Sequence, residues 1–515
     1  MANVKATDLI DFTRASKGHA LAKVSYGEEL VTNGTFTDNI DGWTKVGDAA
    51  STISYSAGKI EADAATTLDG ALQSFATVVG KVYYATADIA LGTSNQARLV
   101  TQPTEDFTLT TTDKTVSLVF VATSATTTIR VDSYAGTGTF TADNISVKEV
   151  TFDQPNGTLQ LFEHPQGIPR IEYDADGNLL GLLIEESRTN LITYSEDFSN
   201  AAWTKYGASV VASTTTAPDG FTTPYEIVEN SGAATQHRIV DSISISSGVT
   251  YTASVYVKRG TGSRQFGILN VLGGSRVYFN LDTGTVATET LGSGKIEDVG
   301  GGWYRCSSTG VSTSTSTAFY LALCDGTTTG SETYDGDGLS SLVIYGAQLE
   351  AGAFPTSYIK TTGSTATRSA DVASIPVSDF GYNQNEGTLF VEAQMFIKDV
   401  SYKAIANLNT DGSNRIRIIS SSSVNVIQAE ITNGGTAQLS ISETIPESSL
   451  FSGAIAYKQN DSSSSVNGSV ETTDTACTIP AVTKLDIMTG NSGHIKSIKY
   501  IPKRLSNAKL QELTS

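Results

Sequence analysis

The chain has few of the residues that build disulfide scaffolds, metal knuckles or membrane spans. Its 515 residues include only 3 Cys, 3 Met and 11 Pro. Three cysteines supply neither a disulfide framework nor a paired Cys-x-x-Cys site, so Cys306, Cys324 and Cys477 are expected to be reduced and structural. No stretch reaches the roughly 18 apolar residues of a membrane span. Met1–Lys23 lacks the apolar segment of a signal peptide, so we expect a protein made in a cytosol.

Charged residues are also scarce, and basic ones most of all. Charged side chains make up 17% of the sequence, with 34 Lys and Arg against 53 Asp and Glu, so the net charge is −19. Such a field repels the phosphates of nucleic acids and the anionic surface of a membrane. We therefore expect no nucleic-acid partner and no membrane partner.

What the chain has in their place is strand and turn sequence. Ser and Thr are abundant and 47 residues are Gly, a composition that favours strands and turns over helices. Residues 251–258 alternate apolar and polar side chains, as a half-buried strand does. The helical spacing of apolar residues is clearest in the tail, at residues 506–513. The sequence predicts an all-β, multi-domain protein.

One set of strand-like sequences occurs twice, in the same order. The two copies share a segment that leads into a Trp and a second segment further on. These segments are residues 29–36, 42–47 and 80–87 in the first copy, and residues 190–198, 202–207 and 248–255 in the second. The repetition predicts two related β-sandwiches, each with its Trp (Trp43 and Trp203) at an equivalent position.

The repeat and the composition divide the chain into five segments. Residues 28–150 and 190–362 are the two related sandwiches, and residues 363–515 form a third domain without the Trp repeat. Residues 1–27 precede the first sandwich, and residues 151–189 separate it from the second.

The residue types that bind sugars suggest six candidates. Aromatic rings stack on the apolar face of a pyranose, while Asn and Arg side chains bind its hydroxyl groups. The candidates are Trp43, Trp203, Tyr206, Asn414, Arg415 and Asn467. A second interpretation stays open for the two repeated Trp residues, which at equivalent strand positions can equally fill the cores of the sandwiches.

Metal and catalytic motifs are weak by comparison. Asp335 and Asp337 resemble a fragment of a calcium loop but also suit a turn, so a structural calcium stays open. The four His residues show no metal-ligand spacing, and no other cofactor is expected. Glu185 and Glu186 have the residue types of a glycosidase pair, but a strand end explains them as well. We expect no enzyme activity.

Several longer segments resemble a family of bacteriophage and prophage virion proteins, mostly tail fibres or tail-associated proteins. The segments that carry the resemblance are residues 11–16, 169–173, 181–191, 194–199, 302–306, 346–352 and 500–510. The resemblance implies that the second sandwich is a jelly roll similar to a carbohydrate-binding module, and the repeat extends the jelly roll to the first sandwich. The resemblance also implies that the last domain is a concanavalin-like or laminin-G-like sandwich.

In the family, segments like residues 11–16 and 169–173 follow one another directly. We therefore predict that residues 1–27 and 151–189 are two halves of a small β connector into which the first sandwich is inserted, which is tolerated when the ends of a domain lie close together.

The same resemblance implies a function. We expect a non-catalytic virion protein, assembled in the host cytoplasm, that acts as a tail fibre or tail adhesin. Its expected partners are other virion proteins and a host surface polysaccharide, and a homotrimer is expected. Two alternatives stay open: a head fibre or capsid decoration that makes structural contacts only, and a polysaccharide depolymerase.

Overall fold

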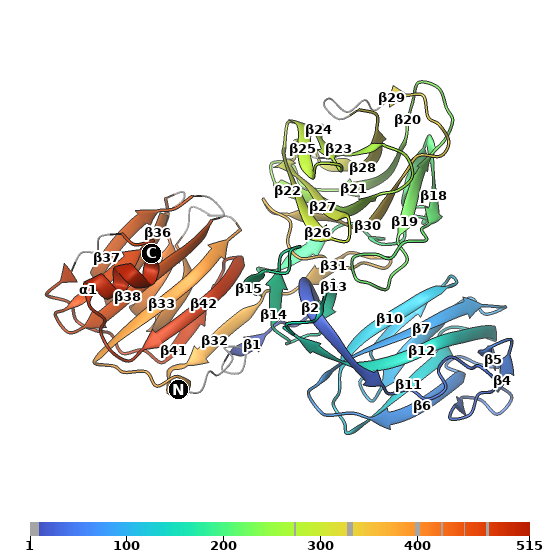
Figure 1. The fold of residues 1–515 in the computed structure, drawn as a ribbon, viewed down its shortest axis with the longest axis horizontal. Helices are drawn as coiled ribbons and strands as arrows, with labels where there is room; N and C mark the ends of the chain where they lie inside the picture. The colour runs from blue at the N-terminus through green and yellow to red at the C-terminus, as the bar shows by residue number, and fades with distance from the viewer. Residues whose placement is uncertain are drawn as a thin grey trace.

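Three β-sandwiches meet at a common junction in the computed structural model (Figure 1). The structure describes residues 10–271, 274–326, 333–396, 402–423, 426–446, 449–469 and 473–515. Nearly all the regular structure in these residues is strand, and the exceptions are α1 (Asn507–Thr514) and a single 3₁₀ turn at Val377–Asp379. The prediction of an all-β, multi-domain chain is confirmed.

The first sandwich packs two antiparallel sheets, which we call its inner and outer sheets, around one apolar core. The inner sheet has the order β10 (Lys114–Val121), β7 (Val82–Leu91), β12 (Gly138–Phe152), β2 (Gly18–Glu29) and β13 (Thr158–His164), with β5 (Lys59–Ala64) and β4 (Thr52–Ser56) attached to β12. The outer sheet has the order β3 (Thr44–Val46), β6 (Gly70–Ala76), β11 (Thr126–Ser133), β8 (Ala97–Gln102) and β9 (Phe107–Thr110).

The second sandwich repeats this plan with two six-stranded sheets. The inner sheet has the order β18 (Ala208–Ala212), β19 (Tyr225–Glu229), β30 (Ser341–Ala351), β22 (Thr250–Arg259), β27 (Trp303–Val311) and β26 (Ser293–Gly300). The outer sheet has the order β17 (Thr204–Tyr206), β21 (Arg238–Ser244), β28 (Ser316–Cys324), β23 (Gln265–Val271), β24 (Ser275–Asn280) and β25 (Thr285–Thr290). Two short pairs lie beside them: β16 (Arg188–Asn190) with β31 (Ala366–Arg368), and β20 (Thr235–Gln236) with β29 (Thr333–Tyr334).

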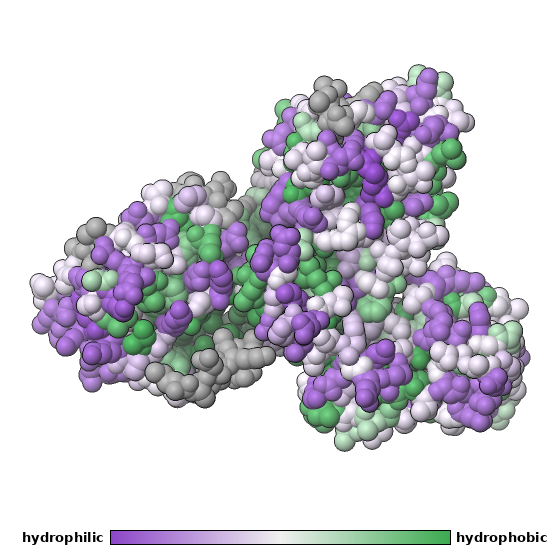
Figure 2. Space-filling view, in the orientation of Figure 1, coloured by the Kyte–Doolittle hydropathy of each residue, from purple (hydrophilic) through white to green (hydrophobic). Residues whose placement is uncertain are grey.

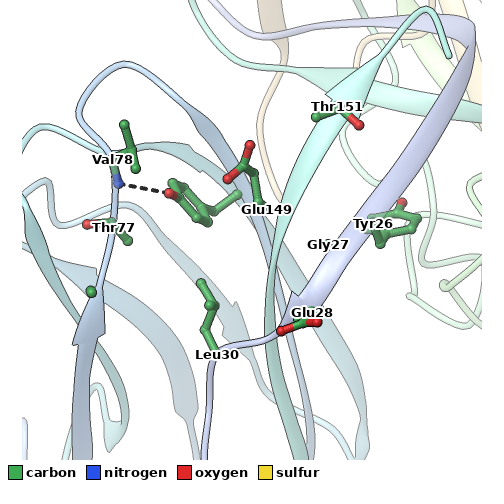
Figure 3. Close-up of a pocket in the computed structure, with 10 residues that line it drawn as sticks. Tyr26, Gly27, Glu28, Leu30, Thr77, Val78, Glu149 and Thr151 are labelled. Carbon is green, nitrogen blue, oxygen red and sulfur yellow. Dashed lines mark hydrogen bonds between the residues drawn. The ribbon is translucent and has the colours of Figure 1, made fainter.

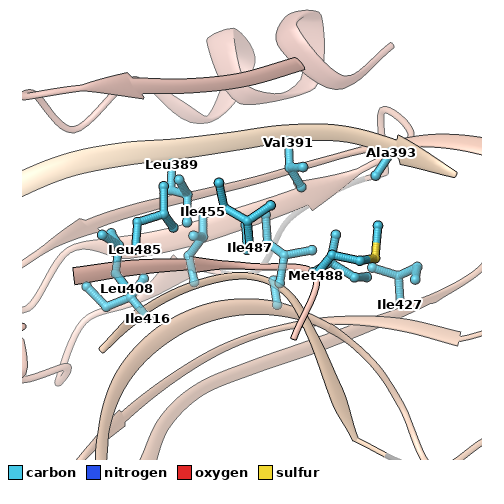
Figure 4. Packing of buried hydrophobic residues seen from close by; sticks show 14 of the residues in the cluster. Leu389, Val391, Ala393, Leu408, Ile416, Ile427, Ile455, Leu485, Ile487 and Met488 are labelled. Atoms are coloured by element: carbon cyan, nitrogen blue, oxygen red, sulfur yellow. The ribbon is translucent and has the colours of Figure 1, made fainter. Parts of the chain in front are cut away.

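The third sandwich has two seven-stranded sheets and the largest apolar core, in which Leu389, Ile416 and Ile455 interlock (Figure 4). One sheet has the order β1 (Asp11–Thr13), β32 (Val372–Pro376), β41 (Lys484–Ile487), β34 (Lys403–Asp411), β35 (Asn414–Ser420), β36 (Val426–Asn433) and β37 (Thr436–Thr444). The other has the order β14 (Arg170–Tyr173), β15 (Leu179–Ile184), β42 (Gly493–Ile501), β33 (Glu386–Met395), β38 (Leu450–Lys458), β39 (Ser462–Val466) and β40 (Thr473–Asp474). Helix α1 covers this second sheet through Leu510.

The described part of the predicted connector, residues 1–27 and 151–189, forms no sheet of its own. Its strands β2 and β13 extend the inner sheet of the first sandwich, whereas β1, β14 and β15 extend the two sheets of the third. An open strand edge is a template for pairing, and β15 pairs along the side of β42 that β33 leaves open. Leu182 and Ile184 of β15 thereby enter the apolar core of the third sandwich.

Equivalent hydrogen bonds show what the repeated sequences do in the two related sandwiches. The indole nitrogen of Trp43 donates to the carbonyl of Asn33 (3.1 Å). That of Trp203 donates to the carbonyl of Tyr194 (2.9 Å). The shared segments therefore hold the Trp of each sandwich against the loop that precedes it.

A second matched set closes the other end of each copy. The hydroxyl of Tyr83 accepts the amide of Val78, and the hydroxyl of Tyr251 accepts the amide of Ser246, both at 2.9 Å. The repeat thus encodes the packing and loop closure of a sandwich, and both copies use it in the same way.

A cluster of five buried charges lies where the three sandwiches meet. Arg170 donates to both carboxylates of the cluster, at 2.8 Å to Glu185 and 2.5 Å to Asp371. Arg14 pairs with Asp371 at 3.2 Å, and Arg368 approaches Glu185 at 3.5 Å. All five side chains are at most 1% exposed. We call these residues the junction cluster.

The carboxylates of the junction cluster also accept hydrogen bonds from other segments. Ser357 donates to Glu185 through its backbone amide (2.7 Å) and its hydroxyl (2.6 Å). The amide of Glu185 donates to Asp371 at 2.8 Å. Because Ser357 follows the last strand of the second sandwich, the cluster ties all three sandwiches to the same few atoms.

We predict that the junction loses stability in acid. Burial raises the pKa of Glu185, but Arg368, Arg170 and the hydrogen bonds from Ser357 outweigh burial and lower the pKa from 4.5 to about 2. A carboxyl group whose pKa is lower in the folded state stabilises that state above the unfolded pKa and loses this effect as the pH falls through the folded one. The temperature of the first unfolding transition, measured by calorimetry, is expected to fall between about pH 4.5 and pH 2.

The matched variant is Glu185→Gln, which cannot titrate. Its first transition is expected to be lower than that of the native chain at pH 7, because a buried ion pair is broken, and to depend less on pH in the same window. Identical pH profiles for the two proteins would contradict the assignment of this acid sensitivity to Glu185.

Candidate functional site

Both repeated Trp residues are buried, which corrects their assignment as sugar platforms. Trp43 is 7% exposed and Trp203 is 1% exposed. Each packs against a Phe, with ring centroids 5.5 Å apart for Phe36 and 5.0 Å apart for Phe198. A ring enclosed in this way offers no face to a ligand, so the core interpretation fits these two residues.

Tyr206 lies in a different environment. It is 48% exposed, at the edge strand β17, and stands opposite Arg238 of β21. The guanidinium carbon of Arg238 lies 5.2 Å from the ring centre of Tyr206 and 4.0 Å from that of Tyr320 on β28. The neighbouring Ile239 points into the core, so these three side chains lie on the outward face of the outer sheet. We call them the Tyr206 patch.

The outward positions of the three strands that carry the Tyr206 patch hold no carboxylate. Strand alternation identifies the outward positions of β17, β21 and β28, all of which the structure describes. Besides the patch itself, these positions hold Thr204, Val240, Ser242, Ser244, Ser316, Ala318, Ala322 and Cys324. Hydroxyl groups, an arginine and two tyrosines are suited to a polar ligand with a flat apolar face.

The outer sheet of the first sandwich bears a related group of residues. Phe107 and Tyr134 stack at 5.7 Å and are 47% and 40% exposed. The guanidinium of Arg98 lies 5.3 Å from each ring. Unlike Arg238, Arg98 is held by a carboxylate, that of Asp132, at 2.7 Å. These residues lie outside the repeated segments, and only the pairing register of β8, β9 and β11 reveals that they share a face.

The outward faces of the two inner sheets are covered at the junction. In the second sandwich, Leu161 of β13 packs against Tyr256, Tyr345 and Tyr358. In the first, Tyr84 of β7 contacts Phe221, a residue of the second sandwich, with ring centroids 4.3 Å apart. The exposed aromatic rings Phe107, Tyr134 and Tyr206 lie on the outer sheets, although Ala322 and Cys324 on the outward face of the second are buried.

The polar candidates of the third sandwich do not form one site. Asn414 begins β35, where its side chain bonds the carboxylate of Asp411 and accepts the amide of Gly434. Its neighbour Arg415 pairs with Glu430 at 3.2 Å.

Asn467 lies after β39, in the opposite sheet, and accepts the amide of Ser452 at 2.9 Å. Turn closure thus accounts for the contacts of both asparagines, and the structure does not bring Asn467 together with Asn414 and Arg415.

The two aspartates proposed for calcium accept hydrogen bonds from backbone amides. Hydrogen bonds from the Ser340 hydroxyl and from the amides of Ser340 and Leu339 hold the pKa of Asp337 well below its usual range. Asp335 accepts the amide of Ala234 at 2.7 Å. In the described residues, no group of three or more His, Cys, Asp or Glu side chains is arranged to hold a metal ion.

One pocket opens in the first sandwich, with a volume of about 470 Å³ (Figure 3). Its lining residues are Tyr26, Gly27, Glu28, Leu30, Ala76, Thr77, Val78, Tyr83, Glu149 and Thr151. Within it, the Tyr83 hydroxyl is occupied by the Val78 amide and Glu149 pairs with Lys81 at 2.6 Å. These are the same groups that close the loop before β7, so loop closure accounts for the shape of the pocket.

Two surface properties bear on the kind of partner. Hydrophobic and polar side chains are mixed over all three sandwiches on the face shown in Figure 2, and no single apolar area dominates it. Among the described helical residues, none forms a helix long and apolar enough to cross a membrane.

Comparisons with known proteins give only distant structural likenesses. No protein-family model matches the sequence, and no curated protein matches it. Among solved structures, the chain is similar to the N-terminal CBM22-1–CBM22-2 tandem domain of Paenibacillus barcinonensis Xyn10C, with 13% identity, a TM-score of 0.21, and 65% of this chain and 100% of that chain covered. It is also similar to the LG1-3 region of the laminin α2 chain, with 9% identity, a TM-score of 0.16, and 97% and 96% covered. Both TM-scores are too low to support a further conclusion about the fold or the function of this chain.

We predict that Trp203 and Tyr206 differ sharply in their effect on stability, although only two residues separate them. Trp203→Ala removes a buried ring and is expected to destabilise the second sandwich by about 3–5 kcal/mol. Tyr206→Ala changes an exposed side chain and is expected to cost about 0.5 kcal/mol or less. Urea unfolding followed by tryptophan fluorescence, with near-ultraviolet circular dichroism for Trp203→Ala, measures both. Equal losses in the two variants would contradict the assigned burial.

Proposed function

We propose that the chain is a non-catalytic glycan-binding protein whose binding surface includes the Tyr206 patch. The observation that carries the proposal is an exposed Tyr ring beside an Arg on an open sheet face. An aromatic ring stacks on the apolar face of a sugar, and a guanidinium supplies several donors in a fixed fork for its oxygens. The surrounding Thr and Ser hydroxyls add further donors and acceptors.

The absence of a catalytic role rests on where the acidic side chains lie. Glu185, one of the pair with glycosidase-like residue types, is 1% exposed and bound by two arginines and Ser357. A buried carboxylate held in this way reaches no scissile bond. In the pocket of the first sandwich, Glu149 is paired with Lys81. Both observations support a binding function rather than hydrolysis.

The setting that we propose is a phage particle. The sequence resemblance to tail-fibre and tail-associated virion proteins supports a tail adhesin, with other virion proteins and a host surface polysaccharide as partners. A homotrimer suits such a fibre. The buried junction supports this setting too, because it holds the outer sheets in fixed directions while the inner sheets are covered.

We predict that Tyr206→Ala weakens glycan binding without unfolding the protein. The native chain is expected to bind at least one polysaccharide on an array of bacterial surface glycans. Loss of a stacking ring on an open face is expected to weaken that binding by about tenfold or more. Tyr402→Ala, which removes another exposed Tyr (57%), on the third sandwich, is the matched control and should bind as the native chain does.

The array also separates the alternatives. Silence across all host polysaccharides, with a folded protein, would contradict the proposal and favour a head fibre or capsid decoration with structural contacts only. Release of sugar from a host polysaccharide would favour a depolymerase.

A further inference from the structure

The positive charge of the Tyr206 patch indicates which class of glycan it can bind. Arg238 lies between Tyr206 and Tyr320, and its Nε atom is buried without a hydrogen-bond partner. Within the part of the chain that the structure describes, its guanidinium makes no hydrogen bond or ion pair with the protein. In a chain with 53 acidic and 34 basic residues, a cation that is held between two rings and has no acidic partner among the described residues can accept an anion from outside.

The first sandwich shows how the same fold neutralises its arginines. The pairing register places Asp132 opposite Gly70, which in turn stands opposite Val46, three positions after Trp43. In the second sandwich Ala322 stands opposite Arg238, which stands opposite Tyr206, three positions after Trp203. Asp132 and Ala322 therefore occupy equivalent positions in the two outer sheets.

The difference between Asp132 and Ala322 gives the two outer sheets different charges at this position. Asp132 binds Arg98 at 2.7 Å and also binds Arg130, so the cations of the first sandwich have an internal partner. Ala322 supplies no carboxylate to Arg238. Fixed in place by two rings, the guanidinium of Arg238 presents donors whose geometry matches a carboxylate or a sulfate.

A second cation lies on the same face. Arg276 of β24 is exposed and alternates with Val277, a core residue, so it points outward with the patch. Its strand is two positions from that of Tyr320 in the sheet, a separation of about 10 Å. The outward face of the sheet therefore carries a second arginine, on the far side of Tyr320 from Arg238.

We propose that the Tyr206 patch binds an acidic saccharide, with a ring stacked on Tyr206 and its carboxylate or sulfate group on Arg238. This inference rests on the proposed glycan-binding function and specifies its ligand class. The bound anion pairs with Arg238 in the second sandwich as the carboxylate of Asp132 pairs with Arg98 in the first. Binding is expected to weaken as the salt concentration rises, because the contact is partly exposed.

The test measures binding of four polymers to the full chain by titration calorimetry. Polygalacturonate is compared with its methyl ester, and dextran sulfate is compared with dextran, so that each acidic polymer has a neutral counterpart. The native chain should prefer at least one acidic member by about tenfold or more, and the pair that shows the preference distinguishes a carboxylate from a sulfate. Arg238→Gln should remove the preference, and Arg238→Lys should retain part of it.

Two further variants make the test specific. Ala322→Asp places in the second sandwich the carboxylate that the first one has, and it should remove the preference while Tyr206 and Arg238 remain. Arg415→Gln, which removes an arginine already paired with Glu430, should leave it unchanged. Circular dichroism checks the folding of each variant, and Arg238→Gln alone decides the question if Ala322→Asp does not fold.

Three results would overturn the inference. One is equal binding of acidic and neutral polymers, which leaves the proposed glycan binding standing. Another is a preference for acidic polymers that survives in Arg238→Gln. Absence of binding to all four polymers also overturns it, and the glycan array then decides the proposed function separately.

Discussion

The arrangement of this molecule depends on five charged side chains buried away from water. Arg170 bridges Glu185 and Asp371, and Arg14 and Arg368 complete the cluster. Moving each of these ions out of water costs several kcal/mol of free energy. This cost is offset only when each ion finds partners in good geometry. The partners come from segments up to 357 residues apart in the chain, so the pairing is satisfied in only one arrangement of the three sandwiches. The cluster therefore specifies how the sandwiches sit.

That arrangement decides which surfaces are free. In the second sandwich the outward face of the inner sheet is covered by β13, and in the first it is covered by a loop of the second sandwich. Aromatic side chains such as Tyr84 and Tyr345 are thereby enclosed. Exposed aromatic rings lie beside arginines on both outer sheets. Where the first sandwich supplies Asp132 as a partner for its arginines, the second has Ala322, so related folds carry surfaces of different charge.

Much of the fold could be predicted from the sequence because it follows from local rules. Alternating side chains indicated strands, the Asp176–Gly177 turn lies where the hairpin β14–β15 reverses, and the tail forms helix α1. The paired charges of the junction could not be predicted, because the partners are distant in sequence and single charges in strands have no signature. For the same reason, the exposed pair of Phe107 and Tyr134 could not be predicted. Their shared face depends on the register of β8, β9 and β11, which no local pattern reveals.

The most direct test of the account is hydrogen exchange at the junction. The amides of Glu185 and Ser357 donate to the buried carboxylates of Asp371 and Glu185, so their exchange reports whether the junction opens. If the cluster holds the three sandwiches together, these two amides exchange as slowly as those of the core strand β22. Exchange at the rate of exposed loops, while β22 stays protected, would show three sandwiches that move independently and would contradict the central claim.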